Sequence, residues 1–428
     1  MTLHRAIAKS AAETTLAEQF AALSGAALSP WREAAFRRFE EAGLPTRRVE
    51  AWHYTDLRAA LATAAPLAKA PDAAAIEAAR RSLASLPRAG ATRLVLLDGR
   101  FVATLSDPPP PGVALVAAAP EVPALAAADA MLALDVALTL GGCALTIEPG
   151  GEAPRIEIVH CFSADRAEAV YSRLAIALRA EARAAVVERF VGARADAQRH
   201  HATWLSTCRP APGAKATHVA SVEDAAGLHV ESQVAQLAKR AELDAFGFVS
   251  GGALVRRQIF ASLAGERARI GLGGLSLVDG RRHADMTLEV VHAARGGESR
   301  EFFRHIVADD GTGVFQGKVV VRPGAQKSDG AMKSQAILLS PQAAMNNKPE
   351  LEILADDVVC GHGATVGALD PEQVFYLQAR GLPRSEAEAM LLEAFAAEAI
   401  ARVGEPEFAA ILLATTRVWL ARRAGAAR

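Results

Sequence analysis

The sequence predicts a mainly β protein whose central β region is flanked by helical segments at both ends. Between about 143 and 366, short apolar or alternating runs recur and are separated by glycine-rich or polar corners. Both flanking segments are rich in Ala, Leu, Glu and Arg, which favours helices. Many short strands without intervening helices are typical of a sandwich, a barrel or a β-solenoid. Periodicity alone does not choose among these three architectures.

The composition is that of a folded protein with no strong overall charge. The chain has 428 residues, of which 51% are hydrophobic, and this is enough for a substantial core. Its 47 basic and 48 acidic residues give a formal net charge of −1, which provides no global field for nucleic acid. The N-terminal segment has no uninterrupted apolar stretch, and Pro123, Asp129 and Asp135 interrupt the alanine-rich stretch. We therefore expect a cytoplasmic protein without a membrane span.

The cysteines do not form a disulfide or zinc pattern. Cys143, Cys161, Cys208 and Cys360 are widely spaced, and the chain contains no C-x-x-C pair. A disulfide framework is not expected in a large intracellular chain. The first three cysteines are predicted to be small buried hydrophobic residues.

The N-terminal third is predicted to be helical with one strand. Helices are expected from about 10 to 90, interrupted at Pro45 and Pro66. A strand is predicted at 92–99, and the four prolines at 108–111 predict a stiff surface connection. A helix near 124–139 then leads to the β region.

The central region is predicted to consist of short strands. Each prediction depends on an apolar or alternating run bounded by turn residues. The runs are Ala144–Ile147, Ile156–Val159, Ala185–Phe190, Ala216–Val222, Ala241–Phe248, Leu254–Leu263, Ala268–Leu277, Met286–Val291, Val314–Val321, Ala336–Leu339 and Leu351–Leu354.

After position 370 the pattern becomes helical again. Ser385 and Glu388 predict a capping box just after Pro383, and the segment 404–406 separates two helices. Two apolar stripes are expected, one on each helix. They consist of Ala387, Met390, Leu391, Ala394 and Phe395, and of Phe408, Ile411, Leu412, Thr415 and Trp419.

Cys360 and His362 are the candidate metal ligands. In an extended segment, residues two positions apart lie on one face, with Cα atoms roughly 6.5 Å apart. If the alternation that begins at Leu351 continued unbroken, both side chains would point away from the core, although a corner at 356–357 can reverse the phase. A thiolate and an imidazole suit Fe(II), Zn(II) or an iron–sulfur fragment. Because two ligands do not close a site, others must come from elsewhere in the fold or from a partner.

Other polar groups give weaker predictions. His283, Asp285 and Thr287 share one face of a predicted strand, where a hydrogen-bonded polar ladder is favoured over an acid–base pair. A metal site at His200 and His201 is disfavoured because adjacent strand residues point in opposite directions. The chain has no phosphate-binding motif, so we expect that it binds no nucleotide.

Four motifs in order give the chain a family resemblance. They are A-Q-K-x-D at 325–329, P-x-L-x-I-x-A-D-D-V-x-C-x-H-G-A-T-x-G at 349–367, L-D at 369–370, and F-Y-L-x-x-R-G-L at 375–382. Together they closely resemble the SufD subunits of the bacterial SufBCD machinery for iron–sulfur cluster assembly. The N-terminal E-x-W-x-Y-T at 50–55 is similar to the same family. The sister SufB-type subunits usually have H-E-A where this chain has H-G-A, and they are usually longer.

The resemblance implies a fold and a domain organisation. It selects a right-handed parallel β-helix at 141–369, between an N-terminal mainly helical region at 1–140 and a C-terminal helical region at 370–428. It implies a non-catalytic scaffold that pairs with a SufB-like subunit, contributes to iron acquisition, and docks the SufC-like ABC-type ATPase through its terminal helices. The residues expected at the docking surface are Arg380, Gly381, Leu382, Leu391 and Phe395.

The resemblance also implies roles for the candidate ligands. His362 is expected to be a ligand for iron or a nascent iron–sulfur cluster near the SufB–SufD interface, with Cys360 in a supporting role. Flavin is associated with the complex, but no flavin motif is found in this chain. A homodimer is a further arrangement open to the isolated chain.

Two other functions stay open. One is the SufB-type scaffold subunit, which the residues after His362 disfavour. The other is a β-helix hydrolase or lyase that uses Cys360 with His362, or His283 with Asp285. The aromatic content of 5% is low for a carbohydrate-binding groove, so the enzyme hypothesis has weak support.

Overall fold

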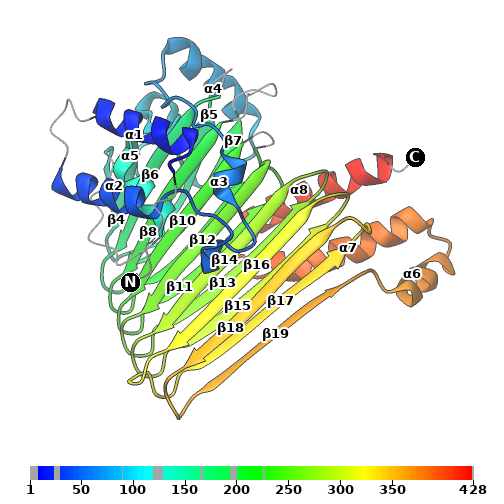
Figure 1. Cartoon of the computed structure of the whole chain (residues 1–428). Helices are drawn as coiled ribbons and strands as arrows, with labels where there is room; N and C mark the ends of the chain where they lie inside the picture. Colours follow the sequence, from blue (N-terminus) through cyan, green and yellow to red (C-terminus); the bar gives the residue numbers. More distant parts are fainter. Residues whose placement is uncertain are drawn as a thin grey trace.

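The chain forms a parallel β-solenoid with helices at both ends (Figure 1). The computed structural model describes residues 8–23, 29–88, 90–118, 129–163, 167–192, 200–224 and 227–426. Within these residues the strands form two sheets, one of ten strands and one of nine, and successive strands from β4 onward alternate between them. The mainly β fold with helical flanks is therefore confirmed, and it is a solenoid rather than a sandwich or a barrel.

The ten-stranded sheet contains β1 (Thr92–Leu97), β2 (Arg100–Phe101), β5 (Arg155–Phe162), β7 (Arg183–Gly192), β9 (Lys215–Val222), β11 (Glu242–Val249), β13 (Arg269–Val278), β15 (Glu298–Val307), β17 (Asp329–Leu338) and β19 (Val359–Gly367). The nine-stranded sheet contains β3 (Val113–Val116), β4 (Gly141–Ile147), β6 (Ala169–Leu178), β8 (His201–Pro210), β10 (Leu228–Leu237), β12 (Leu254–Leu263), β14 (His283–His292), β16 (Thr312–Val321) and β18 (Ala344–Ile353). The pairs β1–β2 and β3–β4 are antiparallel, whereas consecutive coils of the solenoid pair in parallel.

Each coil places alternate side chains in the interior of the solenoid, called the lumen below. Leu228 of β10 pairs with His201 of β8, which lies 27 positions earlier, so equivalent residues stack from coil to coil. The lumen is filled mainly by apolar side chains such as Phe190, Trp204 and Phe315. Such stacking is the main source of stability in a solenoid, because each coil buries its inner face on the next.

Among the inner strands of the solenoid, β6, β8, β10 and β15 were not predicted from the sequence. Each carries buried polar or charged side chains that break the apolar pattern, including Arg173 in β6, Glu231 in β10 and Glu301 in β15. These strands are covered on both faces by the lumen and by flanking helices, so alternation of apolar and polar residues is not required of them.

Most of the N-terminal helices lie on the outer face of the nine-stranded sheet, whereas the helix Ala73–Ser85 packs on β1, β5 and β7 of the ten-stranded sheet (Figure 1). The N-terminal helices are α1 (Ala11–Leu23), α2 (Pro30–Ala42), α3 (Leu57–Ala60), α4 (Ala73–Ser85) and α5 (Ala130–Leu138), with short 3-10 helices at Glu50–Trp52 and Ala103–Leu105. The helix predicted near 124–139 begins at Ala130, where Asp129 accepts hydrogen bonds from the first free amides. Residues 124–128 lie outside the described part of the chain.

Two C-terminal helices, α7 (Arg384–Ile400) and α8 (Pro406–Ala426), lie against the outer face of the ten-stranded sheet, whereas α6 (Pro371–Gln378) contacts α7 and projects away from the sheet (Figure 1). Phe246, Phe248 and Leu275 of the sheet meet Leu392 and Phe408 of the helices in one apolar cluster.

Two predictions about these helices are wrong in detail. Pro383 is the N-cap of α7 without a side-chain cap, and Glu388 instead accepts a hydrogen bond of 2.7 Å from Arg384, so there is no capping box. The apolar stripe of α7 is rotated, because Met390 and Ala394 are exposed. The side chains that α7 buries are Ala387, Leu392, Ala396, Ala399 and Ile400.

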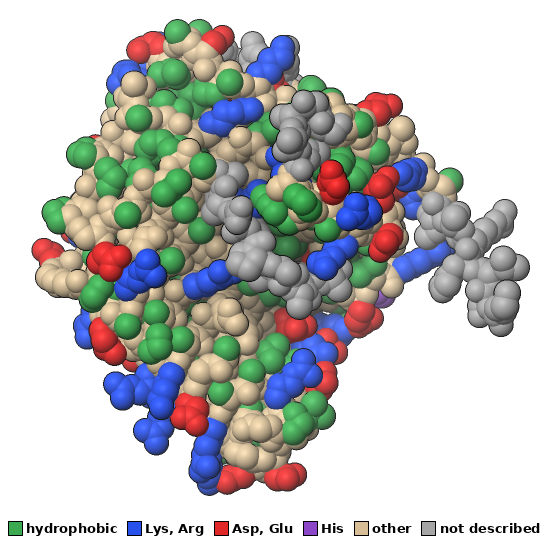
Figure 2. Space-filling view, turned by 90° about the vertical axis from the view of Figure 1, so that its left-hand side faces the viewer, with side chains coloured by type: hydrophobic (Ala, Val, Ile, Leu, Met, Phe, Trp, Pro, Cys, Tyr) green, Lys and Arg blue, Asp and Glu red, His purple; other side chains and the backbone are tan. Residues whose placement is uncertain are grey.

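The surface shows mixed charge. In Figure 2, basic and acidic side chains are interspersed over the visible face without a large field of one sign. Among the described helices, none combines the length and the hydropathy that crossing a membrane requires.

Candidate functional site

The solenoid ends in an uncovered coil formed by β18, the corner at 354–358, and β19, which is called the final coil below (Figure 1). β18 and β19 are the terminal strands of their two sheets. Large apolar side chains are exposed here, namely Ile353, Leu354, Val359 and Val366. Among the described residues, four of the ten exposed large hydrophobic side chains therefore lie in this one coil. Exposed strand edges and exposed apolar residues are typical of interaction surfaces.

Cys360 and His362 both lie on the lumen-facing side of β19. Cys360 is opposite Gly330 of β17, and His362 is opposite Met332, which belongs to the lumenal core. Cys360 is half-buried against that core, whereas His362 is exposed. The predicted shared face is confirmed, and the pair lies at the open end of the solenoid rather than within a sealed interior.

Cys360 and His362 point toward the lumen, whereas unbroken alternation from Leu351 would have pointed them away from the core. Val359 is 73% exposed while Cys360 packs inward, so the phase reverses at the corner, as the sequence allowed. The corner is fixed to the coil beneath, because Lys327 pairs with Asp357 at 2.6 Å and the Gln326 side chain accepts the Asp357 amide at 2.9 Å. The corner therefore sets which way the two ligands face.

A small residue and a polar group lie directly behind Cys360. A Cβ atom added to Gly330 would come within 3.5 Å of the Cys360 sulfur and 3.3 Å of the Ser299 hydroxyl. Ser299 in turn is 3.0 Å from Nε2 of His292, and burial lowers the pKa of His292 to about 4. The thiol therefore has a neutral polar group behind it rather than a cation.

The electrostatic surroundings keep the Cys360 thiol protonated. Burial raises its pKa, the amide of Gly330 partly opposes this, and the charges of Asp329 and Glu301 raise it further. Since the thiolate is the form that binds metals, coordination by Cys360 must release a proton.

The outer side of β19 is open. A Cβ atom added to Gly361 or Gly363 would meet nothing within 4 Å. His362 has no hydrogen bond or ion pair to another described residue. The two ligand side chains thus lie on the lumenal side of β19, and the backbone on its opposite side is open to close approach by another chain.

The pair is not completed within the described part of the chain. There, one group of three His, Cys, Asp or Glu side chains is close enough to hold a single ion, and it consists of His200, Asp224 and His229. Sequence reasoning considered only the adjacent residues His200 and His201 and missed this group. The signal that could have found it is the 27-residue coil repeat, which pairs Leu228 with His201 and so brings His229 within two positions of the level of His200.

The predicted polar ladder on β14 is confirmed. His283 is 2.9 Å from the Thr55 hydroxyl, which also bonds to Asp285, and Thr287 donates to Asp285 at 2.8 Å. Arg256 pairs with the same carboxylate. The ladder therefore attaches the N-terminal region to the solenoid.

The residues predicted at the docking surface have different surroundings. Arg380 is exposed and lies over the ring of Tyr376, with 3.6 Å from its guanidinium carbon to the ring centroid. Leu382 and Leu391 are half-buried, and Gly381 has a φ of 90°. Phe395 is turned toward the solenoid, where Arg304 lies 4.0 Å from its ring centroid. Phe375 and Tyr376, which were not predicted, are 71% and 55% exposed.

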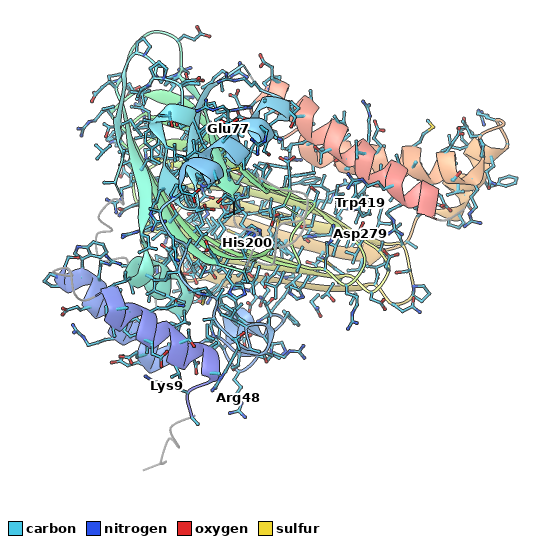
Figure 3. All side chains as sticks on the ribbon, turned by 90° about the horizontal axis from the view of Figure 1, so that it is seen from above. Lys9, Arg48, Glu77, His200, Asp279 and Trp419 are labelled. Carbon is cyan, nitrogen blue, oxygen red and sulfur yellow. The ribbon has the colours of Figure 1, made fainter. Side chains whose placement is uncertain are left out.

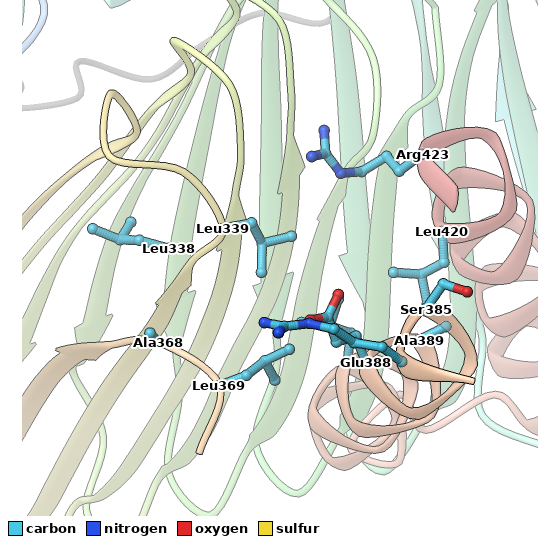
Figure 4. Close-up of a pocket in the computed structure, with 11 residues that line it drawn as sticks. Leu338, Leu339, Ala368, Leu369, Ser385, Glu388, Ala389, Leu420 and Arg423 are labelled. Atoms are coloured by element: carbon cyan, nitrogen blue, oxygen red, sulfur yellow. The ribbon is translucent and has the colours of Figure 1, made fainter. Parts of the chain in front are cut away.

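A cavity lies where the C-terminal helices leave the solenoid (Figure 4). Leu338, Leu339 and Leu369 approach it from the strand ends, and Glu388 and Arg423 approach it from α7 and α8. Its volume is about 410 Å³. The cavity is lined by both apolar and charged side chains, and it lies between the segment that follows β19 and the helices α7 and α8.

Comparisons with known proteins identify related sequences. A family model described as "SUF system FeS cluster assembly, SufBD core domain" matches residues 160–395, and "SufBD protein N-terminal region" matches residues 14–114. The chain is 30% identical to "Iron-sulfur cluster assembly protein SufD" of Escherichia coli strain K12, covering 87% of this chain and 89% of that protein. A SufBD family protein of Synechocystis is 29% identical over 44% of this chain and 42% of its own length. "Protein ABCI7, chloroplastic" of Arabidopsis thaliana is 31% identical over 42% of this chain and 38% of its own length.

Proposed function

The chain belongs to the SufBD family of iron–sulfur cluster assembly proteins, and on that premise we propose that it is a SufD-type, non-catalytic scaffold subunit. In this proposal it works in the cytoplasm, pairs with a SufB-like subunit and docks a SufC-like ABC-type ATPase. Its cargo is iron or a nascent cluster. The observation that carries the proposal is the uncovered final coil, which presents Cys360 and His362 without further ligands.

The two ligands would act in different ways. His362 is exposed and needs no rearrangement to meet an incoming metal ion, so it is the proposed primary ligand. Cys360 is half-buried with a raised pKa, so it would join only when its proton is removed. The partner would supply the remaining ligands and confine cargo transfer to the assembled complex.

The edges of β18 and β19 support pairing with a second subunit. Terminal strands carry unpaired backbone groups that can add a strand from another chain. Ile353, Val359 and Val366 supply apolar contacts beside these edges. We propose that the SufB-like subunit binds across the final coil and covers the ligand pair.

The ligand assignment is tested with His362→Ala in the assembled complex. Removal of a primary ligand should lower the iron bound and the rate of cluster formation by about tenfold or more, while partner binding persists. Iron and sulfide analysis and visible absorbance measure this effect. His53→Ala, which changes another exposed histidine that is not a proposed ligand, is the matched control. Full cluster assembly by His362→Ala would remove the assignment.

Docking of the ATPase is tested with substitutions on α6 rather than with a truncated chain. Removal of the chain after Asp370 would uncover Phe246, Phe248 and Leu275, so loss of capture could follow from aggregation. The double variant Phe375→Ala/Tyr376→Ala removes exposed side chains only and should weaken capture of the SufC-like subunit about tenfold or more. The control is Val49→Ala/Val116→Ala, which changes exposed apolar residues outside the C-terminal helices. Equal capture by both double variants would refute docking at α6.

A further inference from the structure

A second group of ligand-type side chains lies inside the solenoid, well away from the final coil. Asp224 belongs to the corner between β9 and β10, His229 is the second residue of β10, and His200 directly precedes β8. All three are buried, with exposures of 5%, 3% and 2% respectively. Figure 3 shows His200 among the strands, between the two helical ends of the molecule.

The ligand atoms of these residues converge. Nε2 of His229 is 3.1 Å and Nε2 of His200 is 3.3 Å from the same oxygen, Oδ2 of Asp224. All three ligand atoms lie within 4.8 Å of one another. In a tetrahedral site with metal–ligand bonds of about 2.0–2.1 Å, neighbouring ligand atoms are roughly 3.3 Å apart. The observed spacing therefore fits three ligands of one ion.

Gly227 leaves space directly beside both imidazoles. A Cβ atom at this position would lie 2.5 Å from Nε2 of His200 and 2.6 Å from Nε2 of His229. Gly227 is not among the residues with positive φ, so its backbone conformation does not require glycine. Its amide donates a hydrogen bond of 3.0 Å to the Asp224 carboxylate, which orients that ligand. The missing side chain keeps the space between the two nitrogens open.

A neighbouring group shows that two histidines and a carboxylate need not form such an arrangement. His160 and His218 also contact one carboxylate in the lumen, that of Glu188, at 2.8 Å and 2.6 Å. They bind different oxygens, so the carboxylate lies between them, and the three do not form a convergent group. This group is a hydrogen-bonded bridge and provides an internal control.

The surroundings of the convergent group suit a bound cation. The ring of Phe162 stacks on His200 with 4.1 Å between centroids, and Phe190 lies 6.1 Å from His229. This aromatic wall lowers the local polarity and strengthens electrostatic interactions within the site. The carboxylate of Asp224 supplies one negative charge, and two neutral imidazoles supply lone pairs, a ligand set that suits Zn(II) or Fe(II).

We propose that His200, Asp224 and His229 bind one divalent first-row transition-metal ion, Zn(II) or Fe(II), inside the solenoid. The site is separate from Cys360 and His362 and does not depend on a partner subunit. Two histidines and one carboxylate leave one or more coordination positions free for water or another small ligand.

The test uses the full chain with the final-coil ligands removed, as Cys360→Ser/His362→Ala. After treatment with a chelator, this background should bind one equivalent of Zn(II), measured by calorimetry, and one of Co(II), measured by absorbance. The Co(II) spectrum should lack thiolate charge-transfer bands, because the proposed ligands are nitrogen and oxygen. Anaerobic Fe(II) titration then compares the two proposed metals directly.

Variants in the same background identify the ligands. Asp224→Asn and His229→Gln should each weaken Zn(II) binding at least tenfold, while His218→Gln, which changes the Glu188 bridge, should leave it unchanged. If a ligand variant does not fold, the proposal is tested by the Co(II) spectrum of the Cys360→Ser/His362→Ala background, which should show one bound equivalent and no thiolate bands. Absence of one-equivalent binding, thiolate bands in that spectrum, or binding insensitive to both ligand variants would overturn the proposal. Each of these outcomes would indicate that Asp224 only accepts hydrogen bonds, and none would affect the proposed scaffold function.

Discussion

Glu301 is a lumenal residue whose ionisation is coupled to folding. It lies on β15 opposite Met332, two coils behind His362, and is 2% exposed. Burial raises its pKa to about 7, outweighing the Ser299 hydroxyl and the charge of Arg300, which lower it. The native state therefore holds this carboxyl group protonated at pH values where the unfolded chain has released the proton.

Glu301→Gln should change how stability depends on pH. Below pH 4.5, Glu301 is protonated in both the native and the unfolded state of the parent protein. Its ionisation therefore does not lower the free energy of unfolding there. As pH rises from 4.5 to about 7 the unfolded state loses its proton first, and the parent loses about 3 kcal/mol of stability from this residue. Relative to the parent, the Gln variant should gain that amount between pH 4.5 and pH 8 in urea unfolding.

The matched control is Glu298→Gln, which changes an exposed glutamate on the same strand that pairs with Arg269 at 2.8 Å. A pH profile of Glu301→Gln that coincides with that of Glu298→Gln would show that the lumen does not hold a protonated carboxyl group at position 301.

At the scale of elements, one turn conformation recurs along the solenoid. Between each even-numbered strand from β6 to β16 and the strand after it, one residue adopts a positive φ of 55° to 72°. These residues are Glu181, Gly213, Arg240, Arg267, Gly296 and Lys327. Non-glycine residues pay a steric cost of about 1–2 kcal/mol in this region, whereas glycine does not. The sharp turn needed to start the next strand is thus obtained with strain at four of the six positions.

Arg240→Gly should therefore stabilise the protein. Arg240 is exposed with a φ of 55°, so glycine relieves the strain and removes no buried contact. Glycine also raises the entropy of the unfolded chain, which offsets part of this relief. The expected net gain in the free energy of unfolding, measured with urea, is about 0.5–1 kcal/mol. Lys239→Gly, at the preceding exposed position without a positive φ, should be neutral or destabilising. Equal effects of the two variants would contradict this account.

The elements show how far sequence reasoning reaches. The apolar runs located most strands, since a lumen filled with Val, Leu and Phe leaves a strong signal. β10 and β15 were missed because Glu231 and Glu301 are buried in the lumen, which local patterns cannot reveal. The shared face of Cys360 and His362 followed from strand geometry, but their direction depended on a corner that is fixed by Lys327 in the coil beneath. The group around Asp224 depends on stacking of coils and so lies beyond local spacing.

At the scale of the whole molecule, the solenoid is closed on its sides and open at its end. α1, α2, α3 and α5 lie on the nine-stranded sheet, whereas α4, α7 and α8 lie on the ten-stranded sheet (Figure 1). β19 carries the candidate ligands at the edge that these helices leave uncovered. Of the four cysteines, Cys143, Cys161 and Cys208 are buried and Cys360 is half-buried. Cys360 therefore reports on whether the final coil is covered in the assembled complex.

The most direct measurement is alkylation of Cys360 with and without the SufB-like subunit, followed by mass spectrometry. In the isolated native chain, Cys360 should be the cysteine that reacts, slowly at neutral pH because its pKa is raised, and Cys360→Ser should abolish labelling. Pairing with the SufB-like subunit should lower the labelling rate about tenfold or more, because the partner covers the final coil. An unchanged rate in a complex shown to be assembled would contradict the claim that another subunit completes this site.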